Sequence, residues 1–173
     1  VMDEDNCMVD VAKFYMEFIC DESCGKCTPC RIGTRRMLEI LTRITEGKGT
    51  LEDLDKLEEI SNLIKTGSLC ALGQTASNPV MSTMKHFRDE YIAHVVDKKC
   101  PAKVCKNLMS YVIDKDKCIG CGMCARQCPV DAIARTDYVA PGKKKPALAI
   151  DAMKCAKCGA CIATCKFGAI SKE

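Results

Sequence analysis

The chain has no tryptophan, few aromatic residues (5%) and no apolar run of about 18 residues, the length that a transmembrane helix needs. Its first residues, VMDEDNCMVD, lack the basic and apolar stretches of a secretory signal peptide. We therefore expect a cytoplasmic protein that neither spans nor crosses a membrane. The chain also lacks an initiator methionine, which predicts a C-terminal piece of a longer polypeptide.

Cysteine is abundant by contrast, with 16 among 173 residues. A disulfide framework is typical of short secreted domains that cannot build a core. Here 47% hydrophobic residues over this length can fill one or two small cores without disulfides. Metal ligation is therefore the favoured explanation for the cysteines.

Residues from about 110 to the end form a duplicated module. A shift of 37 residues aligns Ile113-Asp114 with Ile150-Asp151 and aligns two copies of Cys-x2-Cys-x2-Cys-x3-Cys. Three thiolates at steps of three residues surround one face of an iron–sulfur cube, while the fourth reaches the other cluster. The predicted ligand sets are Cys118, Cys121, Cys124 with Cys165, and Cys155, Cys158, Cys161 with Cys128.

The two copies differ just after the last ligand, where Pro129 is replaced by Lys166. This departure leaves the ligand assignment intact but bears on the geometry or potential near the cluster of Cys118. Zinc sites are the alternative, although zinc ribbons use separated Cys-x2-Cys pairs. The module resembles the bacterial two-cluster ferredoxin over about 60 residues.

The preceding region, residues 1–98, has helical periodicity and short connections, which predict an up-down four-helix bundle. On the first helix a stripe is expected to face the core, and it consists of Val11, Phe14, Tyr15, Phe18 and Ile19. The four helices are predicted at about 7–20, about 30–46, between Thr50 and Gly67, and at about 79–97.

A second cysteine motif, ESCGKCTPCRIG, contains Cys24, Cys27 and Cys30 at the start of the second helix. Bundle topology places the turn after the third helix at the same end, so Cys70 of SLCALG can act as a fourth ligand. The N-terminus of the second helix also offers free amides to an anionic cluster. These residues predict a [4Fe-4S] cluster, with a zinc ion on the same ligands as the alternative.

Four cysteines lie outside these motifs: Cys7, Cys20, Cys100 and Cys105. In an up-down bundle the first helix starts where the fourth ends, so Cys7 can approach His94, Cys100 and Cys105, a set suited to tetrahedral zinc. The alternative is three buried or free thiols with a surface histidine, and His86 is the alternative imidazole. Cys20 is expected to be a small packed residue.

The ESCGKCTPCRIG segment with its distal cysteine resembles the C-terminal cluster-binding bundle of the NADH-oxidising flavoprotein subunit of respiratory complex I. With the ferredoxin-like module after it, the chain resembles the C-terminal part of the flavin-bearing β subunit of electron-bifurcating or NAD(P)-linked [FeFe]-hydrogenases. NAD-linked formate dehydrogenases carry similar subunits. The resemblance implies FMN and NAD(P) sites upstream, and the chain itself has no Gly-rich phosphate loop.

The expected fold class is α + α/β, divided into a bundle at 1–98, a linker with the possible zinc site at 99–110 and a ferredoxin domain at 111–173. The resemblance implies an electron-transfer segment that relays electrons between FMN, ferredoxin and hydrogenase clusters, with no catalytic acid or base. Other hydrogenase-type subunits and soluble ferredoxin are the implied partners. A zinc-stabilised interaction module without a redox role is the alternative from another class.

The formal net charge of +3 counts every thiol as neutral. Three [4Fe-4S] clusters with four thiolates each would add about −2 apiece and bring the charge to about −3. The basic composition is therefore no argument for nucleic-acid binding.

Overall fold

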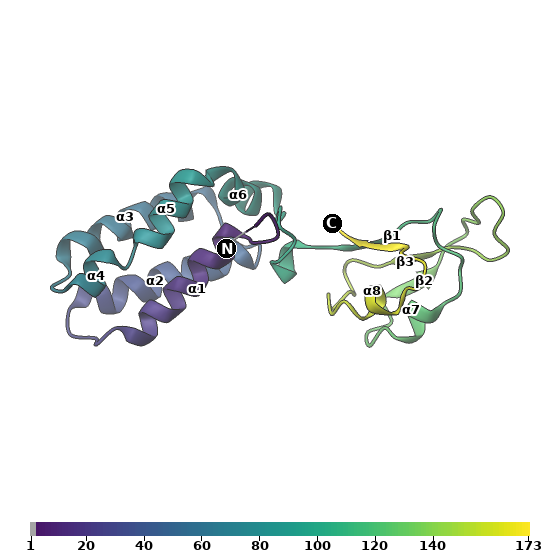
Figure 1. Ribbon diagram of the computed structural model, residues 1–173, viewed down its shortest axis with the longest axis horizontal. Helices are drawn as coiled ribbons and strands as arrows, with labels where there is room; N and C mark the ends of the chain where they lie inside the picture. Colours follow the sequence, from purple (N-terminus) through teal and green to yellow (C-terminus); the bar gives the residue numbers. More distant parts are fainter. Residues whose placement is uncertain (1–2) are drawn as a thin grey trace. The chain divides into compact units, whose positions relative to one another are not determined.

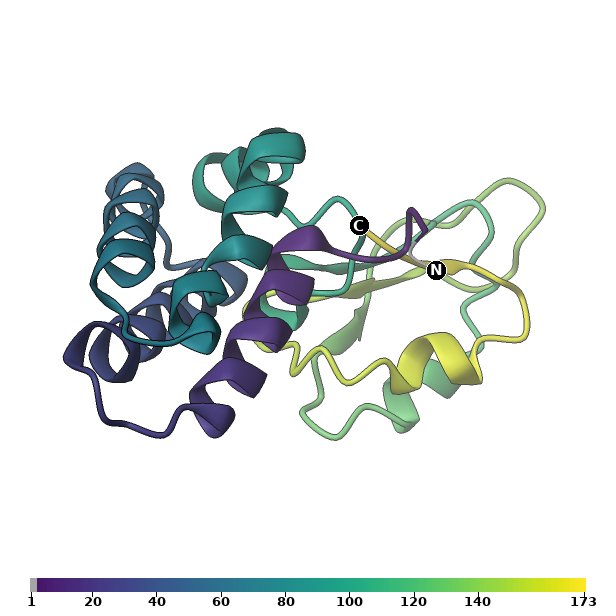
Figure 2. The same cartoon turned by 60° about the vertical axis from the view of Figure 1, so that its left-hand side comes forward.

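A computed structural model describes residues 3–173. The chain divides into two compact units, a helical unit that ends at Leu108 and a repeat unit that comprises Met109–Glu173 (Figures 1 and 2). In the described part of the chain, no helix has both the length and the apolar composition that crossing a membrane would require.

The helical unit contains three long helices. Helix α1 packs against α2, and α2 packs against α3, whereas the shorter α5 lies against α1 (Figures 1 and 2). Pro29 lies in the first turn of α2, where its missing N–H costs no hydrogen bond. The bounds of these helices are α1 Met8–Glu22, α2 Thr28–Thr45, α3 Leu51–Gly67, α4 Ala71–Thr75 and α5 Asn78–His86.

The fourth expected helix is interrupted rather than continuous. Helix α5 ends before Phe87, α6 spans Arg88–Ile92, and a π-helical turn, η1, spans Ala93–Asp97. The turn ends at Lys98 in the left-handed conformation (φ 53°). Side-chain periodicity continues across the break, which is why the sequence predicts one helix there.

The inward face of α1 agrees with the expected one at Ile19 and differs from it at the aromatic residues. Phe14 and Phe18 are 65% and 55% exposed, so the aromatic stripe faces outward. Both stripes recur at helical spacing, and Ala12 on the buried stripe lets the neighbouring helices approach more closely than an aromatic ring would. The buried side chains of α1 are Met8, Val9, Ala12, Met16 and Ile19.

Residues 99–108, expected to belong to a linker, pack into the helical unit. Cys100, Cys105 and Leu108 are buried in the same hydrophobic cluster as the helices. The short 3-10 helix η2, Lys106–Leu108, ends this segment. The helical unit therefore extends past residue 98.

The repeat unit has two small antiparallel strand pairs. Strand β1, Tyr111–Ile113, pairs with β4, Ile170–Lys172, and β2, Ile133–Arg135, pairs with β3, Leu148–Ile150. Each pair thus combines a strand from one repeat with a strand from the other. The short helices α7, Met123–Arg126, and α8, Ala160–Thr164, pack together (Figure 1).

The duplication is also visible in the backbone. Gly122 and its counterpart Gly159 both precede a short helix with φ near 76° and 79°. Gly120 and its counterpart Lys157 are both left-handed as well, at 68° and 55°. The two cysteine loops therefore share a left-handed backbone at both of these positions despite their different sequences.

Asp53 stabilises the start of α3. Its buried carboxylate accepts a hydrogen bond from the Thr50 N–H at 3.0 Å and forms an ion pair with Arg43 of α2. The carboxylate therefore caps one helix and ties it to another.

We expect Asp53→Ala to lower the free energy of unfolding of the helical unit by about 1–3 kcal/mol. The variant loses the hydrogen bond that caps α3 at the Thr50 N–H and the ion pair with Arg43. The exposed neighbour Glu52 is the matched control, and Glu52→Ala should cost less than about 0.5 kcal/mol. Urea unfolding of anaerobic full-length protein, followed by circular dichroism, measures both. Equal midpoints for the two variants would contradict this role of Asp53.

Candidate metal centres

The register of the strand pairs brings cysteines of different repeats together. Ile113 at the end of β1 lies opposite Ile170 at the start of β4. The loop that leaves β1 and the loop that arrives at β4 therefore lie at the same end of the pair. Cys118 follows Ile113 by five residues, and Cys165 precedes Ile170 by five. Two cysteines far apart in sequence thus meet at one end of a strand pair.

The second pair repeats this geometry. Ile133 at the start of β2 lies opposite Ile150 at the end of β3. Cys128 precedes Ile133, and Cys155 follows Ile150, again by five residues each. The fourth cysteine of each repeat is therefore delivered to the other repeat by strand pairing.

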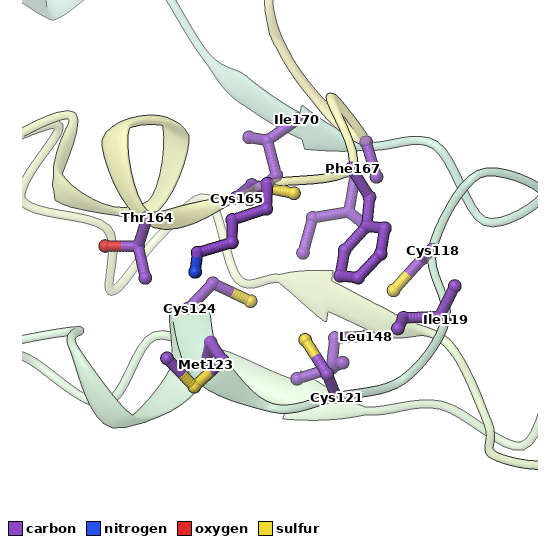
Figure 3. Close-up of a pocket in the computed structure, with 13 residues that line it drawn as sticks. Cys118, Ile119, Cys121, Met123, Cys124, Leu148, Thr164, Cys165, Phe167 and Ile170 are labelled. Atoms are coloured by element: carbon purple, nitrogen blue, oxygen red, sulfur yellow. The ribbon is translucent and has the colours of Figure 1, made fainter.

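Two cavities of the repeat unit contain the two predicted ligand sets. The first has a volume of about 290 Å³ and an otherwise mostly apolar lining. In Figure 3 the sulfurs of Cys118, Cys121 and Cys124 point into the space between them. Cys165 lies across this space, on the connection between α8 and β4. The second cavity is smaller, about 20 Å³, and its cysteines are Cys128, Cys155, Cys158 and Cys161.

Backbone amides already point at the cysteine sulfurs. The Ala132 N–H donates to Cys128 Sγ at 3.3 Å, and the Lys157 N–H donates to Cys155 Sγ at 3.4 Å. Such N–H···S bonds stabilise negative charge on cluster ligands. A Cβ at Gly120 would collide with the Pro146 carbonyl oxygen, so glycine permits the close approach of this loop. These features fit an anionic iron–sulfur cluster.

Burial governs the ionisation of the inner cysteines. Desolvation raises the pKa of the Cys124 and Cys161 thiols, so burial by itself favours their neutral forms. A coordinated metal deprotonates such thiols outright. Iron would therefore supply the positive charge that compensates the negative charge of these buried sulfurs in their thiolate form.

The motif at the start of α2 is brought to the turn before α4. Cys27 precedes α2, and Cys70 precedes α4. The backbone N–H of Leu69 hydrogen-bonds to Cys27 and lowers the pKa of that thiol. A Cβ at Gly73 would lie 3.3 Å from the Cβ of Cys30, which shows how closely the α4 turn approaches α2. The predicted set of Cys24, Cys27, Cys30 and Cys70 thus lies at one end of the helical unit.

Two serine hydroxyls lie beside this cysteine set. Ser23 Oγ accepts from the Gly25 N–H at 3.4 Å and lies 3.3 Å from Cys30 Sγ, so its proton can be directed to the sulfur. Ser68 Oγ is buried and makes no hydrogen bond of regular geometry within the described residues, yet it lies close enough to Cys27 to help lower its pKa. An anionic cluster here would give this orphaned hydroxyl an acceptor.

Another set has the compact geometry of a single-ion site. Within residues 3–173, one group of potential ligands, Cys7, His94, Cys100 and Cys105, has its ligand atoms all within 4.8 Å of one another. Cys7 Sγ and Cys105 Sγ are 3.8 Å apart, and His94 Nε2 lies 3.3 Å and 3.5 Å from these sulfurs. A tetrahedral zinc ion with Zn–S bonds of about 2.3 Å separates two sulfurs by about 3.8 Å.

The histidine of this set is oriented by its second nitrogen. His94 Nδ1 lies 2.7 Å from the Glu90 carbonyl oxygen, which accepts the Nδ1 proton and leaves Nε2 free to face the thiols. The Glu90 carboxylate accepts a hydrogen bond from the Met8 N–H at 3.0 Å. The π-helical turn therefore positions His94 against the first residues of α1.

The electrostatics of the set favour a positive charge at its centre. Burial opposes charging of His94, but the hydrogen bonds that its protonated ring donates to the sulfurs of Cys100 and Cys7 outweigh burial and raise the pKa of His94 to about 10. Hydrogen bonds from Cys105 and Cys7 lower the pKa of Cys100. A divalent cation would supply this positive charge directly.

The alternative residues lie elsewhere. His86 is exposed and lies beside Arg88 and Glu58 in a separate groove. Cys20 is half-buried, and its desolvation raises the pKa of the thiol. Helical periodicity alone does not show which histidine faces the thiols. The interruption after α5 and the π-helical turn determine the direction of the His94 side chain.

Comparison with known proteins finds two segments of the chain that are similar to iron–sulfur families. Residues 10–94 match the family model of the NADH-ubiquinone oxidoreductase-F iron-sulfur binding region, and residues 117–169 match that of the 4Fe-4S dicluster domain. The chain thus contains two segments that are each similar to an iron–sulfur domain family. The first segment includes the cysteine set at the start of α2, and the second includes the eight cysteines of the two cavities in the repeat unit.

Curated relatives are similar to part of this chain. The HndC subunit of the NADP-reducing hydrogenase of Solidesulfovibrio fructosivorans is 62% identical over 136 residues, which are 79% of this chain and 28% of that protein. The F subunit of the NADH-quinone oxidoreductase of Mycobacterium bovis is 52% identical over 101 residues, 58% of this chain and 23% of that protein. The chain therefore spans about a quarter of the length of these relatives.

A solved structure shows a similar partial match. The NAD+-reducing [NiFe]-hydrogenase in its H2-reduced state matches with a TM-score of 0.53 and 34% identity, over 55% of this chain and 16% of that one.

Crossed ligation makes a specific prediction about Cys128. We expect Cys128→Ala to remove or convert the cluster of Cys155, Cys158 and Cys161 and to leave its neighbour intact, because Cys128 lines only that cavity. Iron analysis and electron paramagnetic resonance (EPR) of the dithionite-reduced full chain measure this. The matched variant Cys165→Ala should have the reciprocal effect, and loss of the Cys118 cluster in Cys128→Ala would refute the crossed assignment.

Proposed function

We propose that the chain is the electron-transfer segment of a multisubunit, flavin-dependent and NAD(P)-linked [FeFe]-hydrogenase. It would relay electrons between FMN, ferredoxin and hydrogenase clusters, as in electron bifurcation. The observation that carries the proposal is the pair of interleaved cysteine cavities in the same chain as the oxidoreductase-F cysteine set. The 62% identity to an NADP-reducing hydrogenase subunit extends over 79% of the chain and supports the hydrogenase assignment.

Three [4Fe-4S] clusters would give this segment its one-electron chemistry. The protein residues act as ligands and as the environment of the sulfurs, and no acid–base step is assigned to them. Apolar side chains in the repeat unit limit water, while backbone N–H groups and the serine hydroxyls stabilise negative charge. The ligands would be Cys24, Cys27, Cys30, Cys70, Cys118, Cys121, Cys124, Cys165, Cys155, Cys158, Cys161 and Cys128.

We also propose that Cys7, His94, Cys100 and Cys105 hold one zinc ion with a structural role. All four side chains are buried, and together they offer a closed set of one imidazole and three thiols. The ion would tie the start of α1 to the segment that follows η1. The repeat unit would then be attached through a fixed end of the helical unit.

FMN and NAD(P) would bind a different part of the complete protein. Residues 3–173 contain a bundle-like helical unit and a small repeat unit, and both are accounted for by cysteine sites. Other subunits of the hydrogenase-type complex and soluble ferredoxin would be the electron partners. A cytoplasmic location suits a chain rich in thiol ligands, because reducing compartments keep thiols free.

Anaerobically purified full-length protein tests the proposal. We expect about 12 iron atoms per chain and a visible absorption that bleaches with dithionite, because three four-iron clusters are reducible. Cys70→Ala should lower the iron content by about four or convert the cluster to a three-iron form, and Cys20→Ala, the matched control, should not. A colourless protein that binds zinc alone would instead establish the interaction-module alternative.

Removal of the zinc ligands provides a separate prediction. The double variant Cys100→Ser and Cys105→Ser should lose about one zinc per chain and keep three reducible clusters, because the altered residues line neither cavity of the repeat unit and do not belong to the cysteine set at the start of α2. Elemental analysis and EPR measure the two outcomes. His86→Ala should retain the zinc, and zinc-free wild-type protein of unchanged stability would contradict the structural role.

A further inference from the structure

The two cavities of the repeat unit differ in charge at one position. Lys166 lines the cavity of Cys118, whereas its counterpart Pro129 does not line the other cavity. Within residues 3–173, Lys166 is the one charged side chain that lines either cavity. Most other residues that line one cavity occupy positions equivalent to those that line the other; Leu148 and Tyr111 are one such pair. The duplication therefore provides an internal comparison for the charge of Lys166.

Other lysines do not distinguish the two cavities in this way. Lys117 and Lys154 are counterparts, each directly before the first cysteine of its repeat, so their charges are matched. Lys145 packs its backbone near Gly120, but its side chain does not line the cavity. Lys157 has no charged counterpart, because Gly120 holds the equivalent position, and its N–H donates to Cys155 Sγ, but its side chain lines neither cavity.

The charge of Lys166 is not neutralised by a carboxylate. None of the ion pairs among the described residues involves Lys166. A [4Fe-4S] core with four thiolates carries about −2 when oxidised and about −3 when reduced. A nearby cation stabilises the more negative form more strongly and so raises the reduction potential.

We propose that Lys166 raises the reduction potential of the cluster held by Cys118, Cys121, Cys124 and Cys165 above that of its neighbour. A single electron that enters the repeat unit then resides mainly on this cluster. One donor, an iron–sulfur centre or a flavin, loses one electron, and the accepting core goes from 2+ to 1+ without a proton. The inference rests on the proposed function, because it requires both clusters.

Tyr111 is the competing feature in the other cavity. A Cβ at Gly159 would lie 3.1 Å from the Tyr111 hydroxyl, which places that hydroxyl beside the ligand loop. Burial and then the nearby cysteines raise the pKa of Tyr111, so it remains a neutral dipole. A net charge acts over about 10 Å at moderate salt, whereas a hydroxyl dipole acts only near contact. Lys166 should therefore dominate the difference between the clusters.

Redox potentiometry of the full chain, followed by EPR, tests the inference. We expect Lys166→Met to lower the upper midpoint of the repeat unit, so that the ratio of electron occupancy between its two clusters falls about fivefold to tenfold. This corresponds to about 40–60 mV for one electron. Lys166→Arg should keep the wild-type midpoints, since it keeps the charge. The cluster of the helical unit serves as a reference in the same sample.

Two matched variants and a salt series make the test specific. Pro129→Lys should raise the lower midpoint, and Lys145→Met should shift the upper midpoint much less than Lys166→Met does, because Lys145 does not line the cavity. Because Lys166 is exposed, raising the ionic strength from about 0.05 M to about 0.5 M should narrow the gap in the wild type and not in Lys166→Met. The salt series on the wild type gives a result even if one of the variants fails to fold.

Unchanged midpoints in Lys166→Met, an equal shift in Lys145→Met or a gap independent of salt would overturn the inference. A chain without reducible clusters would instead refute the proposed function, so the two failures are distinguishable.

Discussion

Exchange of strands between the two repeats is the constraint on which the repeat unit depends. Each repeat contributes one strand to each antiparallel pair, so neither repeat can complete a pair alone. The same exchange carries the fourth cysteine of each repeat into the other repeat's cavity. Strand pairing and ligand convergence are therefore one structural event, and cluster binding would stabilise the fold that creates the sites.

The helical unit achieves convergence by a different route. Its candidate cluster ligands come from two turns that the packing of α2 against α3 brings to one end. Its compact Cys-His set depends instead on the break after α5 and the π-helical turn. The irregular backbone thus occurs where the His94 side chain is oriented toward the cysteine sulfurs, in agreement with the association of π-helical turns with functional sites.

Small departures from symmetry separate sites that the duplication makes alike. The two cysteine loops share a left-handed backbone at equivalent positions, even where Gly120 corresponds to Lys157. Their electrical environments differ, because the counterpart of Lys166 does not line the opposite cavity and the polar Tyr111 corresponds to the apolar Leu148. Two copies of one motif can therefore hold similar clusters at different potentials.

The sequence alone determined the cysteine spacing, the duplication and the positions of the long helices, because ligand steps and helical periodicity are local properties. It could not choose the inward face of α1, since the stripes of Phe14 and Ala12 are equally periodic. Bundle topology favoured His94 over His86, but the sequence could not show that Cys100 and Leu108 pack into the helical unit, or that the interruption after α5 brings His94 against Cys7. Only tertiary packing decided these points, because each depends on contacts between residues distant in sequence.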